Sequence, residues 1–116
     1  MSLTNNNRLD YVEIPAENIK ATKEFYSRVF DWKFDDYGQD YTSFHDGRLS
    51  GGFVKGPPVI KGGALLVIYA DDLALTYAKV VGAGGKISKS TFEFPGGRRF
   101  HFIDPNGNQL AVWSDK

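Results

Sequence analysis

The side chains able to carry acid–base or nucleophilic chemistry are few in this sequence. It has two histidines, His45 and His101, and no cysteine, which excludes thiolate nucleophiles, disulfides and cysteine-ligated metals together. Glu13 lies in a segment of alternating apolar and polar residues, where its carboxylate could act as a general base or pair with Arg99 or Lys33. Glu13, His101 and His45 are therefore the candidate catalytic residues, and each could equally have a structural or ligand-binding role.

The pair Arg98–Arg99 is the second feature that suggests chemistry. Guanidinium groups bind anionic oxygens through two parallel hydrogen bonds, so the pair could clamp an anionic ligand, or it could form a solvated strand edge. The 14 basic and 14 acidic residues of the chain cancel. Without a positive excess, the field that draws proteins to phosphate backbones is missing, and we expect no nucleic acid among the partners.

The longest apolar run, Ala64–Ala70, is far too short to span a bilayer, and no signal peptide precedes it. We therefore expect no membrane partner and a cytoplasmic location. Residues Met1–Asn7 are polar without periodicity and are expected to form a flexible tail. The 116-residue chain as a whole is long enough for one domain with a real core.

The first half of the chain predicts one strand, one helix and three further strands. Leu9–Pro15 alternates apolar and polar residues, as a half-buried strand does. Asn18 is a good N-cap for a helix whose apolar stripe ends at Phe30. Three short strands follow, over Trp32–Phe34, Asp40–His45 and Leu49–Phe53.

The second half predicts the same order after a linker, Lys55–Gly63, which is rich in glycine and proline. A strand over Ala64–Ala70 precedes a helix that Asp72 caps and that Gly82 and Gly84 end. A strand over Gly85–Ser90, a loop over Thr91–Gly97 and a hairpin over Arg98–Trp113 close the chain. The hairpin turn is Asp-Pro-Asn-Gly-Asn, a cluster of turn-forming residues.

These two halves form an internal repeat. Asn18–Ile19 matches Asp72–Leu73 as helix cap and first stripe residue, and Asp46–Gly47 matches the later turn that starts at Asp104. The sequence therefore predicts an α+β fold of two tandem βαβββ modules, about residues 8–55 and 62–115, within a single domain of residues 1–116. Each module would pack its helix on one face of a four-stranded sheet, and the other faces would curve around a shared cleft.

The chain resembles the vicinal oxygen chelate superfamily of glyoxalases, bleomycin-resistance proteins and extradiol dioxygenases. The resemblance covers about Leu9 to Trp113 and rests on Tyr-Val-Glu-Ile-Pro, on Glu-Phe-Tyr-Ser-Arg-Val-Phe-Asp-Trp-Lys-Phe and on Asp-Pro-Asn-Gly-Asn. It is greatest to small bacterial proteins related to lactoylglutathione lyase. The resemblance implies a glyoxalase-like fold, a small-molecule ligand and a homodimer.

The metal site of the family's enzymes is the point where this sequence departs from the resemblance. Those enzymes hold a divalent cation with His or Gln on the first strand of each module and Glu on the last. The first-strand positions fall here on Tyr11 and Leu65, and the closing-strand positions fall on Ala111 and on Ser50 or Gly51. None of these is a useful imidazole or carboxylate ligand, so we expect no metal and no other cofactor.

Strand alternation predicts which side chains face the cleft. Thr42 and Phe44 would face the first helix. The residues that would instead line an aromatic, partly polar ligand site are Tyr11, Glu13, Tyr41, Ser43, His45, Tyr69, Arg99, His101, Gln109 and Trp113.

Three functions fit these features. The first is metal-free binding of a small, partly aromatic or anionic molecule, as the resemblance to bleomycin-resistance proteins implies. The second is a lyase or isomerase of lactoylglutathione-lyase type that uses Glu13 or a histidine to move a proton. The third is a metalloenzyme with relocated ligands drawn from His45, His101 and Glu13. An RNA-binding sheet is disfavoured by the zero net charge.

Overall fold

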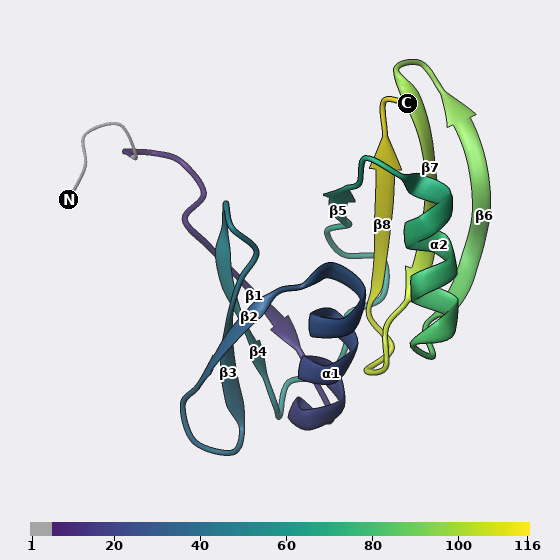
Figure 1. The fold of residues 1–116 in the computed structure, drawn as a ribbon. Helices are drawn as coiled ribbons and strands as arrows, with labels where there is room; N and C mark the ends of the chain where they lie inside the picture. Colours follow the sequence, from purple (N-terminus) through teal and green to yellow (C-terminus); the bar gives the residue numbers. More distant parts are fainter. Residues whose placement is uncertain (1–5) are drawn as a thin grey trace.

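The computed structural model describes residues 6–116, so the first five residues of the predicted tail Met1–Asn7 lie outside the described part. The first module consists of β1 (Tyr11–Pro15), α1 (Ile19–Phe30), β2 (Lys33–Asp36), β3 (Tyr41–His45) and β4 (Ser50–Val54). The second consists of β5 (Leu66–Tyr69), α2 (Leu73–Gly82), β6 (Lys86–Phe94), β7 (Gly97–Ile103) and β8 (Gln109–Ser114). The predicted α+β fold of two βαβββ modules is confirmed (Figure 1).

Each module forms its own four-stranded mixed sheet. The strand orders are β1-β4-β3-β2 and β5-β8-β7-β6, and only the first pair of each order, β1 with β4 and β5 with β8, is parallel. β1 and β5 are therefore edge strands. Figure 1 shows the two modules as two arms that meet near α1 and the β7–β8 turn and separate toward the other end.

Both helices begin at the predicted caps. The side chain of Asn18 accepts a hydrogen bond from the Ala21 N–H, and that of Asp72 accepts one from the Leu75 N–H, which satisfies one free donor of each first turn. α1 ends at Phe30, and the C-cap residue Asp31 lies in the left-handed region with φ of 59°. α2 ends at Gly82, as the sequence predicts.

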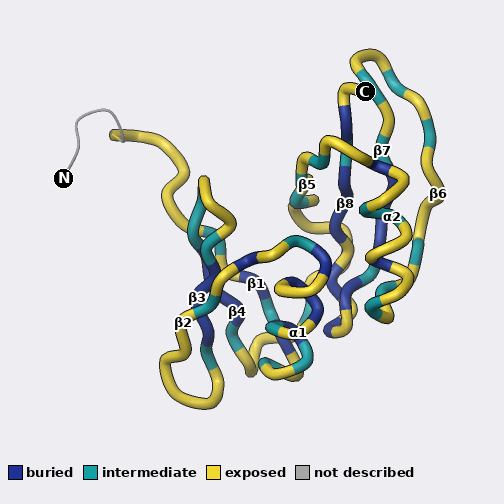
Figure 2. The backbone as a smooth tube through the Cα atoms, in the orientation of Figure 1, coloured by how far each residue is buried: buried dark blue, intermediate teal, exposed yellow. Residues whose placement is uncertain are grey.

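One apolar core runs through both modules on the helix side of the two sheets. Phe44 and Phe53 of the first sheet and Phe100 of the second are buried, and they belong to the same cluster as Phe25 and Val80 of the helices. Thr42 is also fully buried. Figure 2 shows the buried segments along the middle strands of each sheet and the exposed segments at the outer strands and turns. The predicted alternation is thereby confirmed on the helix side.

The three polar residues of the Asp-Pro-Asn-Gly-Asn turn between β7 and β8, Asp104, Asn106 and Asn108, are buried, whereas Pro105 and Gly107 are exposed. Asp104 Oδ1 accepts hydrogen bonds of 2.9 Å from the N–H groups of Asn106 and Asn108. Its other oxygen accepts one of 2.8 Å from the Tyr26 hydroxyl on α1. Complete burial and the neighbouring Asp104 carboxylate raise the pKa of Tyr26 well above its usual range, so this hydroxyl remains a donor.

The same turn also closes the start of the first module's helix. Asn106 Oδ1 accepts hydrogen bonds from the N–H groups of Glu17 and Asn18, at 2.8 and 3.2 Å. Asn108 Nδ2 donates to the Pro15 carbonyl at 2.7 Å. The turn therefore joins the two modules, a role that the sequence pattern did not reveal.

The main error of the sequence-based prediction concerns β6. The expected strand Gly85–Ser90 continues to Phe94, and residues expected in the loop Thr91–Gly97 pair with β7 instead, with Phe92 opposite Arg99 and Phe94 opposite Gly97. Two register shifts, between Ile87 and Lys89 and between Lys89 and Phe92, interrupt the pairing. Such bulges let a strand continue past residues that do not fit the ladder.

Across residues 6–116, no helix combines the length and the apolar character that a membrane crossing requires.

Candidate functional site

The face of each sheet that lies opposite its helix is called here the open face. The predicted site residues on the first open face are Tyr11, Glu13, Tyr41, Ser43 and His45, and those on the second are Tyr69, Arg99, His101, Gln109 and Trp113. These residues alternate along their strands with the residues of the apolar core. The register places Glu13 and Ser43 on either side of Gly52 in the first sheet.

Two tyrosine hydroxyls cover Gly52 on the first open face. A Cβ atom at Gly52 would lie 2.9 Å from the Tyr11 hydroxyl and would clash with the hydroxyl of Tyr41. The two hydroxyls lie 2.5 Å apart, and Tyr41 donates to Glu13 Oε2 at 3.0 Å. Loss of hydration, followed by the hydrogen bonds with Tyr11 and Glu13, raises the pKa of Tyr41. Tyr41 is therefore protonated at neutral pH and acts as a donor to the carboxylate.

His45 is fixed on the same open face by contacts at both ring nitrogens. Its Nδ1 lies 2.9 Å from Ser50 Oγ on β4, and its Nε2 lies 3.0 Å from Asp35 Oδ2 on β2. Ser43, its neighbour on the face, donates to the Gly51 carbonyl at 3.1 Å. Because both ring nitrogens of His45 contact protein groups, this histidine has a structural role: it links β3 to Ser50 of β4 and to Asp35 of β2.

His101, on the second open face, has one free ring nitrogen. Gln109 Nε2 lies 3.0 Å from His101 Nδ1, whereas His101 Nε2 is buried and has no hydrogen-bond partner among residues 6–116. Burial, and then the positive charges of Arg99 and Lys89, lower the pKa of His101. The imidazole is therefore neutral at neutral pH.

Arg99 lies beside His101 and stacks on the aromatic rings of β6. Its guanidinium carbon lies 5.3 Å from the ring centroid of Phe92 and 5.6 Å from that of Phe94. The Lys89 ammonium also lies over the Phe92 ring, 4.5 Å from its centroid. The Arg99 Nε atom is buried and has no partner in the described part of the chain. Such cation–π contacts fix the direction of a side chain that would otherwise be mobile.

Tyr69 and Trp113 continue the aromatic wall across β5 and β8. Their ring centroids lie 5.3 Å apart at an interplanar angle of 74°, and Phe94 lies 6.2 Å from Trp113 on the other side. The Tyr69 hydroxyl lies 2.7 Å from Asp115 Oδ1 and 3.0 Å from Asp71 Oδ1, and its single proton is shared between these two acceptors. The hydrogen bond with Asp115 is the main reason that the pKa of Tyr69 rises to about 12.

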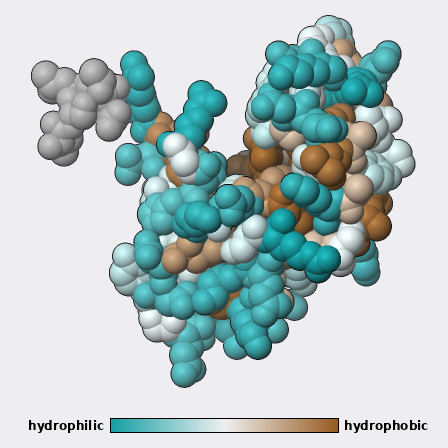
Figure 3. All heavy atoms as spheres, viewed as in Figure 1, coloured by the Kyte–Doolittle hydropathy of each residue, from teal (hydrophilic) through white to brown (hydrophobic). Residues whose placement is uncertain are grey.

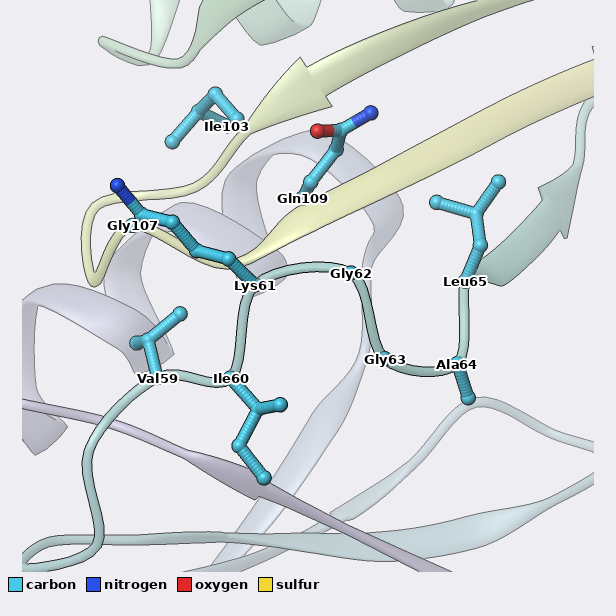
Figure 4. Close-up of a pocket in the computed structure, with 10 residues that line it drawn as sticks. All are labelled: Val59, Ile60, Lys61, Gly62, Gly63, Ala64, Leu65, Ile103, Gly107 and Gln109. Atoms are coloured by element: carbon cyan, nitrogen blue, oxygen red, sulfur yellow. The ribbon is translucent and has the colours of Figure 1, made fainter.

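Two cavities lie beside the linker, and the smaller of them is lined by residues of both modules. The smaller, of about 240 Å³, is lined by Glu13 of β1 and Gln109 of β8, together with Ile60 of the linker. The larger, of about 420 Å³, is lined by the linker and by Gln109 (Figure 4). In Figure 4 the side chain of Lys61 projects toward the β7–β8 side of the linker and that of Ile60 toward β1.

The linker is the part of these cavities that sequence reasoning missed. Residues 59–65 all line the larger cavity, but they fall in and beside a segment interpreted as a connector because of its glycines and prolines. The presence of Ile60 and Lys61 between those glycines and prolines is the signal that could have suggested a contact role. Of the predicted site residues, Gln109 lines both cavities and Glu13 lines the smaller one.

The predicted site residues form two groups, one on each open face. Within residues 6–116, no hydrogen bond or ion pair joins a predicted site residue of the first face to one of the second. The lining of the smaller cavity, which Glu13 and Gln109 share, is the point where the two groups come together. The chain therefore has two open faces, and the lining of the smaller cavity is where their residues meet.

The register corrects one of the positions assigned to the family's metal site. Ala111 lies opposite Val67 and His101, and the residue with the corresponding partners in the first module is Gly52, opposite Glu13 and Ser43. The closing-strand position of the first module is thus Gly52 rather than Ser50 or Gly51. The difference of one residue matters because neighbouring strand residues point to opposite faces.

The residues present do not fit the divalent cation of the family's enzymes. Gly52 and Ala111 carry no donor atom, and the hydroxyls of Tyr11 and Tyr41 fill the space above Gly52. Residues 6–116 contain no group of three or more His, Cys, Asp or Glu side chains that could hold a metal ion. The relocated set of Glu13, His45 and His101 is accordingly not brought together.

Comparisons with known proteins agree with this fold. The family model described as Glyoxalase/Bleomycin resistance protein/Dioxygenase superfamily matches residues 8–112. A curated Mycobacterium bovis protein named "Putative glyoxylase CFP32" is 27% identical over 115 residues, which is 90% of this chain and 44% of that protein. The chain thus spans less than half the length of this relative.

Solved structures show the same architecture at low sequence identity. A glyoxalase/bleomycin resistance protein/dioxygenase family enzyme from Burkholderia phytofirmans superimposes with a TM-score of 0.79 at 19% identity, covering 93% of this chain and 100% of that one. The fosfomycin resistance protein FosX from Listeria monocytogenes, solved as an E126Q mutant with Mn(II) and a dihydroxypropylphosphonic acid, gives a TM-score of 0.80 at 13% identity, with 92% and 89% covered. Together with the family match, these similarities place the protein: the chain belongs to the glyoxalase/bleomycin resistance protein/dioxygenase superfamily.

Proposed function

We propose that this chain binds a small, partly aromatic or anionic molecule on the open faces of its sheets, without a metal ion at the family's positions. The observation that carries the proposal is the loss of both closing-strand ligands, at Gly52 and Ala111, beneath a surface rich in aromatic rings. Small-molecule sites combine such apolar walls with a few polar groups that fix the ligand's orientation. Tyr69 and Trp113 supply the walls, and His101, Arg99 and Gln109 supply the polar groups.

A thermal-shift screen with metal analysis tests this proposal. Aromatic carboxylates, aromatic phosphates and neutral aromatics should be compared with and without EDTA. A specific ligand at one hundred times its Kd stabilises the folded state by about 2.7 kcal/mol, so Tm should rise saturably and EDTA should not change it. Trp113→Ala should abolish the rise, whereas Leu75→Ala, which shortens an exposed apolar residue on α2, should retain it. Stoichiometric zinc, nickel, manganese or iron with EDTA-sensitive stability would overturn the metal-free part.

The alternative is a lyase or isomerase of lactoylglutathione-lyase type that works without a metal. The observation in its favour is that Glu13 of the first module and Gln109 of the second both line the smaller cavity. Turnover of the hemithioacetal of methylglyoxal and glutathione would separate the two functions. Turnover that Glu13→Gln abolishes would favour the enzyme, and ligand binding without turnover would favour the binding protein.

We also propose that two copies form a homodimer. Large apolar side chains remain exposed on β1, on β5 and in the linker: Tyr11, Ile60, Leu65, Val67 and Tyr69. In Figure 3, hydrophobic surface gathers over β5 and beside the hollow between the two arms. A second copy that packs against β5 and the linker would cover these apolar residues.

A further inference from the structure

Two buried N–H groups on the second open face lack an acceptor. Arg99 Nε and His101 Nε2 are both buried, and neither has a hydrogen-bond partner among residues 6–116. The His101 side chain as a whole is almost completely buried, with 7% exposure. Buried polar atoms in folded proteins are nearly always paired, so two unpaired atoms on neighbouring side chains of one strand face need an explanation.

The neighbours of His101 define which nitrogen carries its proton. Gln109 presents its amide N–H₂ to His101 Nδ1 at 3.0 Å, so Nδ1 accepts this bond and the proton of the neutral ring lies on Nε2. Arg99 Nε always carries a proton. Both unpaired atoms are therefore donors. An acceptor group placed between the two side chains would satisfy both.

The surroundings of this donor pair favour a negative acceptor. Arg99 and Lys89 both lie over the Phe92 ring, and the His101 ring lies 5.8 Å from the same ring. The ion pairs of the described residues involve neither Arg99 nor Lys89. Two uncompensated cations and a neutral N–H donor thus converge around one aromatic ring.

We propose that Arg99 Nε–H and His101 Nε2–H together hold an anionic oxygen of the bound small molecule, a carboxylate or a phosphate group. The inference rests on the proposed binding function and names the chemical class of its ligand. We call these two donors the anionic seat. Lys89 adds positive charge beside the seat, and the rings of Phe94 and Trp113 extend the aromatic surface next to it. The ligand is accordingly an anion with a flat apolar body, such as an aryl carboxylate or an aryl phosphate.

The two histidines allow a direct test by NMR, because His45 serves as an internal reference on the other sheet. Nitrogen-15 spectra of the imidazoles in the full chain should be recorded during titration with benzoate, with phenyl phosphate and with neutral benzamide. We expect His101 to be the Nε2–H form in the free protein. One of the anions should shift its Nε2 saturably and raise the pKa of His101, while His45 stays unchanged and benzamide has no such effect.

Two arginine variants separate the seat from general positive charge. Arg99→Met replaces the Nε–H donor and the charge by an apolar chain of similar length, and should weaken binding of the anion by about ten- to a hundred-fold, as loss of a hydrogen bond to a charged group does. Arg98→Met removes the same charge from the neighbouring exposed residue, whose side chain donates to the Lys116 carbonyl, and should leave the affinity unchanged. Equal losses in both variants would overturn the proposed seat.

Other outcomes separate this inference from the function on which it rests. Benzamide that binds as tightly as benzoate, without moving His101, would retain the small-molecule function and overturn the anionic seat. A His101 signal that changes only with protein concentration, and loses this change in Glu13→Gln, would assign the donors to a carboxylate of a second copy and overturn the seat. No response of His101 to either anion, or an Nδ1–H ring in the free protein, would also overturn it.

Discussion

At the scale of single residues, the absence of a side chain at Gly52 determines the chemistry of the first open face. The glycine leaves room for the hydroxyls of Tyr11 and Tyr41, which would meet any added Cβ atom. Tyr41 then donates to Glu13, so the carboxylate is engaged in a hydrogen bond. A carboxylate that already accepts such a bond is less available as a general base.

The two histidines illustrate how the same residue type takes two roles on equivalent strands. His45 on β3 contacts Ser50 and Asp35 through its two ring nitrogens, whereas His101 on β7 uses only one, with Gln109. Their neighbours in the sequence do not distinguish them. The difference arises from residues on adjacent strands, which the sequence places far apart along the chain.

The lowered pKa of His101 predicts a pH dependence of stability. Burial, Arg99 on β7 and Lys89 on β6 all oppose protonation of the folded ring, and the β8 neighbour Gln109 is not titratable. The unfolded chain therefore binds this proton first, so the stabilisation is present above about pH 6.5 and is lost as pH falls below that value. Urea unfolding at pH 7.5 and pH 5 should show a larger loss for the wild type than for His101→Gln.

Because acidic side chains respond to the same pH change in both proteins, their contribution cancels when the two losses are compared. A variant that loses as much stability as the wild type between these pH values would contradict the prediction. The contribution of the Lys89 charge to the lowered pKa of His101 can be tested in the same way. Lys89→Gln should reduce the loss of stability between pH 7.5 and pH 5.

At the scale of elements, the β7–β8 turn has a structural role that exceeds that of a hairpin connection. Asp104 satisfies two N–H groups of its own turn and the hydroxyl of Tyr26, while Asn106 satisfies two N–H groups at the start of α1. The first turn of a helix has free N–H groups that something must satisfy. Here part of the cap of α1 comes from the other module, so the turn holds the two modules in a fixed relation.

Asp104→Ala should therefore be strongly destabilising. It would leave the Tyr26 hydroxyl and two turn N–H groups buried without acceptors, at a combined cost of about 3 to 5 kcal/mol. The repeat supplies a matched control, because Asp46 accepts from the N–H groups of Arg48 and Leu49 in the equivalent exposed turn. Asp46→Ala should cost only about 1 kcal/mol, since water can replace the lost acceptor. Equal losses in chemical denaturation would refute the structural role of the β7–β8 turn.

The elements themselves were largely predictable because their signals are local. Caps, apolar stripes and turn formers placed both helices and the order of all strands correctly, within a few residues at their ends. The extension of β6 to Phe94 was missed because Pro95–Gly96 alone makes the turn, while the bulges that allow the pairing depend on β7. The bond from Asn106 to the start of α1 was also invisible, because it depends on how the modules pack.

At the scale of the whole molecule, the two open faces belong to different sheets, and within residues 6–116 no strand pairing joins β1 to β5. The internal repeat predicted two modules and the alternation on each. It could not predict how the modules sit relative to one another, because that depends on buried contacts such as those of Asp104 and Asn106. The shared cleft of the sequence-based hypothesis therefore stays a prediction, and the structure supports it only at the small cavity between Glu13 and Gln109.

The homodimer is the prediction that belongs to this scale. Val67 and Tyr69 on the edge strand β5 are each 44% exposed, so large apolar side chains remain accessible to another chain at this edge. If a second copy covers them, light scattering at tens of micromolar should give about twice the mass of one chain. Val67→Lys should convert the dimer to a monomer with an unchanged far-ultraviolet circular dichroism spectrum, because a buried lysine ammonium without a partner is costly.

The matched control for this variant lies on α2. Val81 has a comparable exposure of 52% but lies on a helix that faces away from the open faces, so Val81→Lys should remain dimeric. A wild-type protein that is monomeric at this concentration, or a dimer that Val81→Lys breaks and Val67→Lys does not, would exclude the β5 edge as the interface.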